Sequence, residues 1–176
     1  MPNSDHDPFE QLSSAPTSPA SKAKSASAGS GLSLKARAVG FLSRREHSRA
    51  ELARKLSAHV DPDNPGELDK LLDQLEKENW LSDQRFAQSL VNRRASKKGA
   101  ALVAQELRRH GVSDEQVAQL HDQLKSTETV RAREVWEKKF GQPPANAKEY
   151  ARQFRFLASR GFSPDCLRKI LGDADD

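Results

Sequence analysis

The chain has 176 residues, of which 31% are charged and 6% are aromatic, and its formal net charge is +4. So few aromatic residues beside so many charges argue against one large compact core and favour a row of small units. The sequence lacks an apolar run of 18 or more residues and an export signal, and its one cysteine, Cys166, excludes an internal disulfide, so we expect a soluble cytoplasmic protein with no membrane contact.

The two ends of the chain differ from the rest in composition. Residues 1–31 are rich in serine, alanine and proline and poor in large apolar side chains, which predicts a disordered tail, because such a segment cannot offset the entropy lost on ordering. Residues 173–176 form an acidic end.

From residue 32 onward, apolar residues recur three and four positions apart and never alternate with the period of two that a strand needs. The pattern predicts an all-α fold of three units, residues 32–81, 82–124 and 125–172, with three helices in each. In the first unit, Ser48 and Glu51 predict a capping box before the second helix. The three helices of that unit are marked by Leu34, Ala38, Phe41 and Leu42, then Leu52 and Leu56, then Leu68, Leu71, Leu72 and Leu75.

The second and third units repeat this order. Ser82 is the expected N-cap of the second unit's first helix, and Ser113 with Gln116 forms a capping box before its third helix. In the third unit Ser163, followed by Pro164, is the expected N-cap of the last helix. The apolar stripes are Phe86, Leu90 and Val91, then Leu102, Val103 and Leu107, then Val117, Leu120 and Leu124 in the second unit, and Val135, Trp136 and Phe140, then Tyr150, Phe154 and Leu157, then Leu167, Ile170 and Leu171 in the third.

The second and third units also repeat in sequence. The segment LRRHGVSDEQV, residues 107–117, returns as LASRGFSPDCL, residues 157–167. Self-similarity at this period predicts tandem units that stack to bury a shared apolar face, with a weaker first copy. Gly111 and Gly161 each follow a helix and precede an apolar residue, so we expect a left-handed C-terminal cap at both.

Three strings in this order resemble the RecX regulatory proteins, which bind the RecA recombinase. They are WLSDQRFAQSLVNRR at residues 80–94, the segment 99–112 with its ELRRHGV ending, and FRFLASRGFSPDCLRKIL at residues 154–171. The resemblance covers residues 32–171. It implies an elongated, curved array of three tandem three-helix repeats that lies in the groove of the recombinase filament on single-stranded DNA. It also implies that the chain limits filament growth, ATP hydrolysis and strand exchange without hydrolysing anything itself.

Positive charge grows toward the C-terminus. Residues 32–81 carry nine basic and nine acidic side chains, residues 82–124 carry seven and five, and residues 125–176 carry eleven and eight. A polyanion, or a surface near one, is the partner class that this gradient favours. The candidate DNA or filament contacts are Arg93, Arg94, Lys97, Lys98, Arg108, Arg109, Arg152, Arg155, Arg160, Arg168 and Lys169, with Lys138 and Lys139 as further members of the same surface.

Each of these candidates has a structural alternative. Cations at the C-terminal end of a helix are stabilised by the helix dipole without any partner, and a basic helix face can be exposed to solvent without binding anything. Trp80 and Trp136 have the ring chemistry to stack on bases, but both belong to apolar stripes or follow one, so we expect core packing. The same expectation applies to Phe86, Tyr150, Phe154 and Phe162, and Asp83 is expected to stabilise the start of its helix.

The sequence offers no sign of catalysis. Its five histidines are dispersed, Cys166 has no paired cysteine for a zinc site, and the Walker phosphate loop is absent. We therefore expect no enzyme, no cofactor and no metal, and a monomer whose partners are the RecA filament and, more weakly by itself, single-stranded DNA. Two alternatives stay open: an autonomous helical DNA-binding protein, disfavoured by the acidic helix openings SDEQ and SPDC, and a helical adaptor for another protein.

Overall fold

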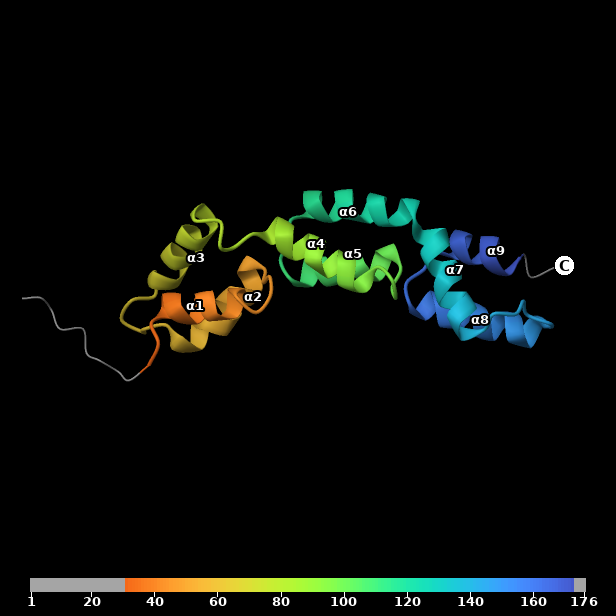
Figure 1. Ribbon diagram of the computed structural model, residues 1–176, viewed down its shortest axis with the longest axis horizontal. Helices are drawn as coiled ribbons and strands as arrows, with labels where there is room; N and C mark the ends of the chain where they lie inside the picture. The colour runs from red at the N-terminus through yellow and green to blue at the C-terminus, as the bar shows by residue number, and fades with distance from the viewer. Residues whose placement is uncertain (1–30, 173–176) are drawn as a thin grey trace, which may run out of the picture. The chain divides into compact units, whose positions relative to one another are not determined.

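The computed structural model describes residues 31–172, so the expected tail, apart from Gly31, and the acidic end lie outside the described residues. Across the described range the chain forms α-helices and one short 3-10 helix, η1, and no strand, which confirms the prediction of an all-α tandem array of three-helix repeats (Figure 1). The elements are α1 (Leu34–Leu42), α2 (Arg49–Leu56), η1 (Ser57–His59), α3 (Glu67–Lys77), α4 (Asp83–Arg94), α5 (Ala100–Arg109), α6 (Asp114–Ser126), α7 (Glu128–Lys139), α8 (Ala147–Ser159) and α9 (Pro164–Leu171).

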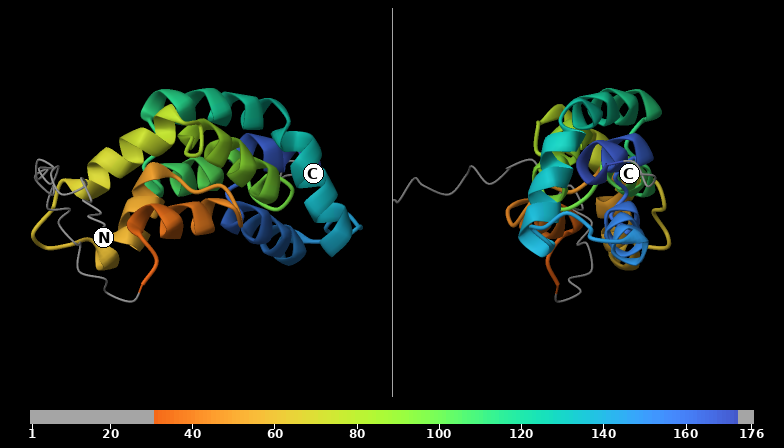
Figure 2. Two further views of the ribbon diagram at one scale, coloured as in Figure 1. Left: turned by 60° about the vertical axis from the view of Figure 1, so that its left-hand side comes forward. Right: turned by 90° about the vertical axis from the view of Figure 1, so that its right-hand side faces the viewer.

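Each group of three helices encloses its own apolar core. We refer to α1–α3 as repeat 1, α4–α6 as repeat 2 and α7–α9 as repeat 3. The three cores centre on Leu52, Leu56 and Leu75 in repeat 1, on Phe86, Val103 and Leu107 in repeat 2, and on Ala132, Leu157 and Leu167 in repeat 3. Within repeat 2, α6 packs along α5, and the two helices lie side by side in both sets of views (Figures 1 and 2).

Serine side chains cap four of the described helices, and three of these caps, Ser48, Ser82 and Ser113, were predicted from the sequence. Ser48 Oγ accepts a hydrogen bond from Glu51 N at 3.1 Å, and Ser82 and Ser113 cap α4 and α6 in the same way. The Glu51 carboxylate, however, contacts Arg45 and His47, so the expected capping box is formed on the serine side.

Ser163 is the N-cap residue of α9, as predicted, but its side chain makes no capping hydrogen bond. It occupies the N-cap position, before Pro164, but its hydroxyl donates to the Glu128 carboxylate at 2.7 Å. The charge-assisted hydrogen bond to this buried carboxylate sets the orientation of the hydroxyl, and in that orientation its oxygen accepts no hydrogen bond from the first N–H groups of α9.

Gly111 and Gly161 end α5 and α8 in the left-handed conformation, with φ of +77° and +80°. The following residues, Val112 and Phe162, are buried and donate from their backbone N–H groups to Leu107 and Leu157. These hydrogen bonds, from an N–H group to the carbonyl five residues earlier, and the buried apolar residue after each glycine confirm the predicted C-terminal caps.

Trp80 is not a core residue, contrary to the prediction, because 48% of its surface is exposed. The backbone turns sharply at Asn79, whose φ is +60°, and the N–H groups of Trp80 and Leu81 then both donate to the carbonyl of Leu75. Leu81 takes the place in the core of repeat 1, so the adjacent indole faces outward. Trp136 is buried as predicted, and its Nε1 donates to Gln153 Oε1 at 2.7 Å.

Neighbouring repeats meet through the same arrangement twice. The first residue of α4, Asp83, accepts a hydrogen bond from the backbone of Arg49, the first residue of α2, at 2.7 Å. The first residue of α7, Glu128, accepts one from Ala100, the first residue of α5, at 3.0 Å. In both cases a carboxylate of one repeat satisfies the free N-terminal donors of a helix in the preceding repeat.

The two cap glycines complete these joints. A Cβ atom on Gly111 would lie 2.9 Å from the Cβ of Ala50 in α2, and one on Gly161 would lie 2.5 Å from Leu102 in α5. Gly99 N also donates to the carbonyl of Arg160 at 2.8 Å, which brings two backbone segments of repeats 2 and 3 into direct contact. The glycines are therefore required both for the caps and for close approach between repeats.

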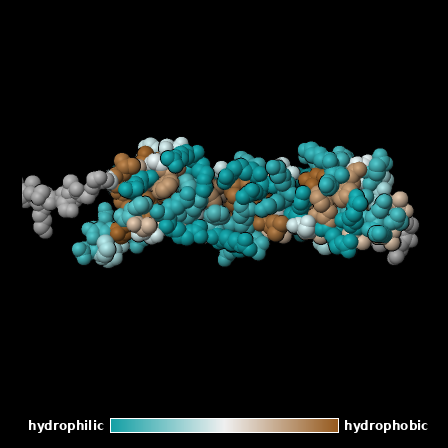
Figure 3. Space-filling model, turned by 90° about the horizontal axis from the view of Figure 1, so that it is seen from below, coloured by the Kyte–Doolittle hydropathy of each residue, from teal (hydrophilic) through white to brown (hydrophobic). Residues whose placement is uncertain are grey.

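The face shown in Figure 3 is mostly hydrophilic, with hydrophobic residues in small separate patches. Within residues 31–172, no helix combines the length and apolar character needed to cross a bilayer.

Candidate nucleic-acid interface

Several of the predicted contact residues form ion pairs within the chain. Arg94 and Lys98 both contact the half-buried carboxylate of Glu106, at 2.9 and 3.1 Å. Burial alone would raise the pKa of Glu106, but the hydrogen bonds from Lys98 and Arg94 outweigh it, so that pKa is lowered. These two cations hold the α4–α5 turn against α5 and are only partly available to an external anion.

Two other candidate arginines pair at the surface. Arg108 lies 3.4 Å from Asp114, and Arg168 lies 2.5 Å from Asp165. All four side chains are more than half exposed, so the pairs are weak and a phosphate can compete with the carboxylates.

Lys97 and Arg160, which are far apart in sequence, line one cleft of about 360 Å³. Lys138 and Lys139 complete its charged wall, and Val135 and Phe156 supply its apolar part. No acidic residue of the described range, 31–172, belongs to its lining. We call this set of residues, together with Ser96, the basic cleft.

Three segments build the basic cleft. Lys97 comes from the turn between α4 and α5, the adjacent lysines from the last turn of α7, and Arg160 from the end of α8. All of these cations stand at or just beyond helix C-termini, where positive side chains are favoured and where backbone carbonyls do not repel them.

Arg131 of α7 positions the turn that carries Lys97. Its guanidinium donates to the carbonyls of Ala95 and Lys98 at 2.7 and 2.8 Å, one on each side of the turn, and to the carbonyl of Leu124 at 2.6 Å. Burial lowers the pKa of Arg131 below its usual value, yet an arginine stays protonated at neutral pH. Repeat 3 thereby fixes the geometry of a repeat 2 loop at the cleft.

Stacked rings and guanidinium groups support the other wall. Arg160 lies over the ring of Phe156, 4.1 Å from the centroid, and Phe156 meets Phe140 edge to face at 5.1 Å. Arg152 covers Phe140 at 5.3 Å. The arrangement holds Arg160 in place, and no acceptor within residues 31–172 pairs with its guanidinium, which can therefore meet an anion.

The remaining candidates do not join the basic cleft. Arg93 donates to the carbonyl of Ser89, Arg109 lines a separate depression beside Lys98, and Arg155 and Lys169 are exposed. Sequence reasoning missed Ser96, Val135 and Phe156 as cleft residues. The sequence carried no signal that singles out this cleft, because α2, α4, α5, α7 and α9 all have two basic residues in their last turn.

Groups that could hold a metal or form a nucleophile are not gathered in the described residues. Between residues 31 and 172, no three histidine, cysteine, aspartate or glutamate side chains are placed to bind a metal ion. The Cys166 thiol is buried, and burial raises its pKa, which disfavours the reactive thiolate.

Comparison with known proteins gives consistent results. Family models described as the second and third three-helix domains of RecX match residues 82–120 and 127–171. The chain is 52% identical over 145 residues to a regulatory protein RecX of Ralstonia pickettii, covering 82% of this chain and 90% of the relative, and 46% identical over 153 residues to one of Chromobacterium violaceum, covering 85% and 96%. A crystal structure of RecX from Lactobacillus salivarius shares the fold, with a TM-score of 0.61 and 19% identity over 81% of this chain and 94% of that one.

Proposed function

Because this chain belongs to the RecX family of regulatory proteins, we propose that it binds the RecA filament on single-stranded DNA and inhibits filament growth, ATP hydrolysis and strand exchange. We propose further that it acts by binding, as a cytoplasmic monomer, and not as an enzyme. On this proposal the recombinase performs the chemistry and the chain shifts its conformational equilibrium.

The basic cleft is the observation that supports contact with the DNA of the filament. It gathers the four cations of Lys97, Lys138, Lys139 and Arg160, and none of its lining residues in the described part of the chain is acidic. Phosphate oxygens accept charge-assisted hydrogen bonds from such groups, and the apolar wall suits the sugar and base of an unpaired strand. The cleft also spans two repeats, so a bound strand would rigidify their joint.

Inhibition follows from differential affinity. A chain of fixed repeats that binds one filament conformation more tightly than another shifts the filament toward that conformation by the difference in binding free energy. If the favoured conformation hydrolyses ATP slowly, the rate falls without any catalytic group on this chain.

The test removes three charges from the basic cleft. In the Lys97→Gln, Lys138→Gln, Lys139→Gln variant, we expect weaker binding to single-stranded DNA and a salt slope smaller by about 2, since each phosphate contact on a single strand contributes roughly 0.7. We also expect the variant to lose most of the inhibition of DNA-dependent ATP hydrolysis by the recombinase.

The matched control removes three exposed lysines outside the cleft, Lys70→Gln, Lys77→Gln and Lys125→Gln. Equal losses in both triple variants would mean that net charge, and not the cleft, determines binding. If the unmodified chain leaves ATP hydrolysis and filament length unchanged, the proposed function is wrong.

An autonomous DNA-binding protein is the alternative function. The first turns of α6 and α9 carry Asp114 and Asp165, whose side chains are 92% and 80% exposed. Acidic first turns repel phosphate where a recognition helix would enter a groove, which speaks against this alternative. Co-purification of the chain with the recombinase after nuclease treatment separates the two functions.

A further inference from the structure

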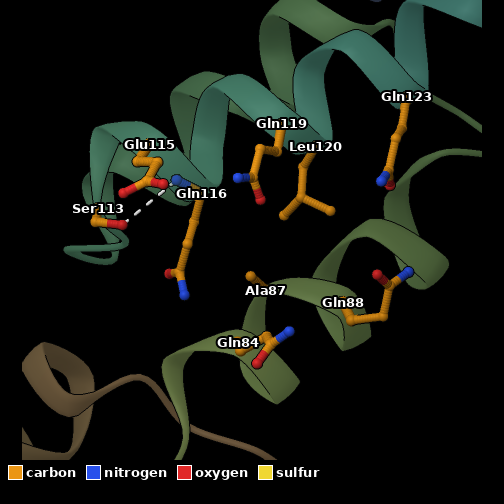
Figure 4. Close-up of a pocket in the computed structure, with 9 residues that line it drawn as sticks. All are labelled: Gln84, Ala87, Gln88, Ser113, Glu115, Gln116, Gln119, Leu120 and Gln123. Atoms are coloured by element: carbon orange, nitrogen blue, oxygen red, sulfur yellow. Dashed lines mark hydrogen bonds between the residues drawn. The ribbon is translucent and has the colours of Figure 1, made fainter.

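A second cleft, of about 400 Å³, lies between α4 and α6 on repeat 2, and its lining is dominated by glutamine (Figure 4). Gln84 and Gln88 project from α4, and Gln116, Gln119 and Gln123 project from α6. We call this the glutamine cleft. The described residues that line it are all different from those of the basic cleft.

The helical period explains why these side chains meet. Gln116, Gln119 and Gln123 are spaced three and four residues apart and form one stripe of α6, while Gln84 and Gln88 form a stripe of α4. Both helices pack on α5, which leaves a space between them. In Figure 4 the two stripes run in the same direction and face each other across it.

The glutamine side chains are mostly unpaired within the described chain. Gln88 Nε2 donates to Asn92 at 3.1 Å, but no hydrogen bond within residues 31–172 involves the side-chain amides of Gln84, Gln116, Gln119 or Gln123. The NH₂ group of each amide can donate to a backbone C=O of a peptide, and its carbonyl oxygen can accept from a backbone N–H. The cleft is therefore suited to recognise peptide groups.

Charge disfavours a nucleic acid in this cleft. Among residues 31–172, the one charged residue of its lining is Glu115, and Asp114 precedes it on the exposed start of α6. A phosphate backbone would be repelled there, whereas a lysine or arginine of a protein would be attracted. The apolar part of the lining, Ala87 and Leu120, has room for a small side chain.

We infer that the glutamine cleft binds an extended segment of a protein partner through its peptide groups, with a basic side chain of that segment at the Glu115 end. The seven-residue rise from Gln116 to Gln123 is about 10.5 Å, which matches about three residues of an extended strand. The inference rests on the proposed function for the identity of the partner, which is then the recombinase.

The experiment uses the full chain labelled with ¹⁵N and synthetic peptides that tile the recombinase of the same organism. We expect at least one peptide with a lysine or arginine to shift the side-chain NH₂ resonances of Gln116 and Gln119. The Gln116→Leu, Gln119→Leu variant, which keeps side-chain size, should bind that peptide at least tenfold more weakly, and so should Glu115→Lys.

The matched control is Gln105→Leu with Gln142→Leu, two exposed glutamines outside the cleft, which should bind the peptide unchanged. Circular dichroism confirms that each variant is folded. The inference is overturned if no peptide shifts these resonances, or if the cleft variants bind the peptide as tightly as the unmodified chain.

Failure of this inference is distinguishable from failure of the proposed function. A chain that inhibits ATP hydrolysis normally while its cleft variants also inhibit normally refutes the glutamine cleft alone. A chain with no effect on the recombinase refutes the proposed function. Binding of single-stranded DNA by the Gln116→Leu, Gln119→Leu variant should be unchanged, because its net charge is the same and the basic cleft is intact.

Discussion

At the scale of single residues, one carboxylate at each joint determines how two repeats meet. Glu128 is 4% exposed and accepts from both the backbone of Ala100 and the hydroxyl of Ser163. It thereby links the start of α7 to the starts of α5 and α9. Asp83 has the equivalent position at the joint of repeats 1 and 2.

Removing Glu128 should destabilise the chain measurably. In Glu128→Ala the buried N–H of Ala100 loses its acceptor, and we expect the free energy of unfolding to fall by about 1–3 kcal/mol in urea titrations. The exposed Glu137→Ala, also on α7, should change it by less than about 0.5 kcal/mol. Equal effects of the two substitutions would contradict the structural role of Glu128.

A second residue-scale feature is the buried group of His47 and Glu51 near the same joint of repeats 1 and 2. His47 is 2% exposed, its Nδ1 lies 3.2 Å from Glu51 Oε1, and Arg45, Lys55 and His110 also face this carboxylate. Burial lowers the pKa of His47. The Glu51 carboxylate opposes this effect, and the positive charges of Arg45 and Lys55 add to it. The pKa of Glu51 is also lowered, because the hydrogen bond from Arg45 and the nearby charges outweigh its burial.

Both lowered pKa values predict a loss of stability in acid. The pKa of His47 is 6.5 in the unfolded chain and lower in the folded chain, so as the pH falls the unfolded chain binds this proton first. The stability that is present above pH 6.5 is therefore lost as the pH falls toward the pKa of the folded chain. Glu51 adds a further loss as the pH falls below 4.5. Urea titrations from pH 7.5 to 5.5 should show this decline, and His47→Gln should flatten it; an unchanged slope in the variant would assign the decline to other groups.

At the scale of elements, glycine is required at the cap position Gly161 but can be replaced by alanine at Gly40 inside α1. Gly161→Ala places a Cβ 2.5 Å from Leu102 at a φ of +80°, so we expect it to reduce the free energy of unfolding by more than about 1 kcal/mol. Gly40, inside α1, has no atom within 4 Å of an added Cβ, so Gly40→Ala should stabilise by about 0.5–1 kcal/mol. Thermal unfolding of both variants tests the pair, and a stable Gly161→Ala chain would contradict the joint as described.

Local signals in the sequence account for the elements well. Apolar spacing and the serine caps identify the helices, and the glycine before an apolar residue identifies the left-handed caps. Contacts between repeats are the part that local signals do not encode. Asp83 accepts from the backbone of Arg49, and Glu128 accepts from that of Ala100, partners that lie 34 and 28 residues away in the chain. Inside single repeats, local signals also missed two features: the Ser163 hydroxyl turns to Glu128, and the turn at Asn79 places Leu81 instead of Trp80 in the core.

The candidate site shows the same division at the scale of the whole described chain. Lys97 and Arg160 were predicted contacts, but their proximity depends on Arg131 and on the backbone contact between Gly99 and Arg160. Pairing of Arg94 and Lys98 with Glu106 is equally a product of the fold. The sequence therefore named Lys97 and Arg160 as candidate contacts, while the fold determined that they share a cleft.

Because each repeat has its own core, we expect the free energy of local unfolding to differ between repeats. Each repeat has its own buried cluster, and repeats 1 and 3 each have a neighbour on one side, so stability is approximately a sum of repeat and interface terms. Weakening one joint should then loosen the terminal repeat beyond it and leave the opposite end protected, in the manner of local unfolding.

Hydrogen exchange with two mirror-image variants tests this arrangement. Asp83→Ala, which removes the acceptor for Arg49 N, should accelerate exchange in α2 around Leu52 and leave α8 around Leu157 nearly unchanged. Glu128→Ala should do the reverse, with faster exchange in repeat 3 and at the start of α5. Both effects follow because a lost interface term lowers the opening free energy only of the repeats that share it. Uniform acceleration over residues 32–172 in both variants would instead mean that the three repeats unfold as one cooperative unit.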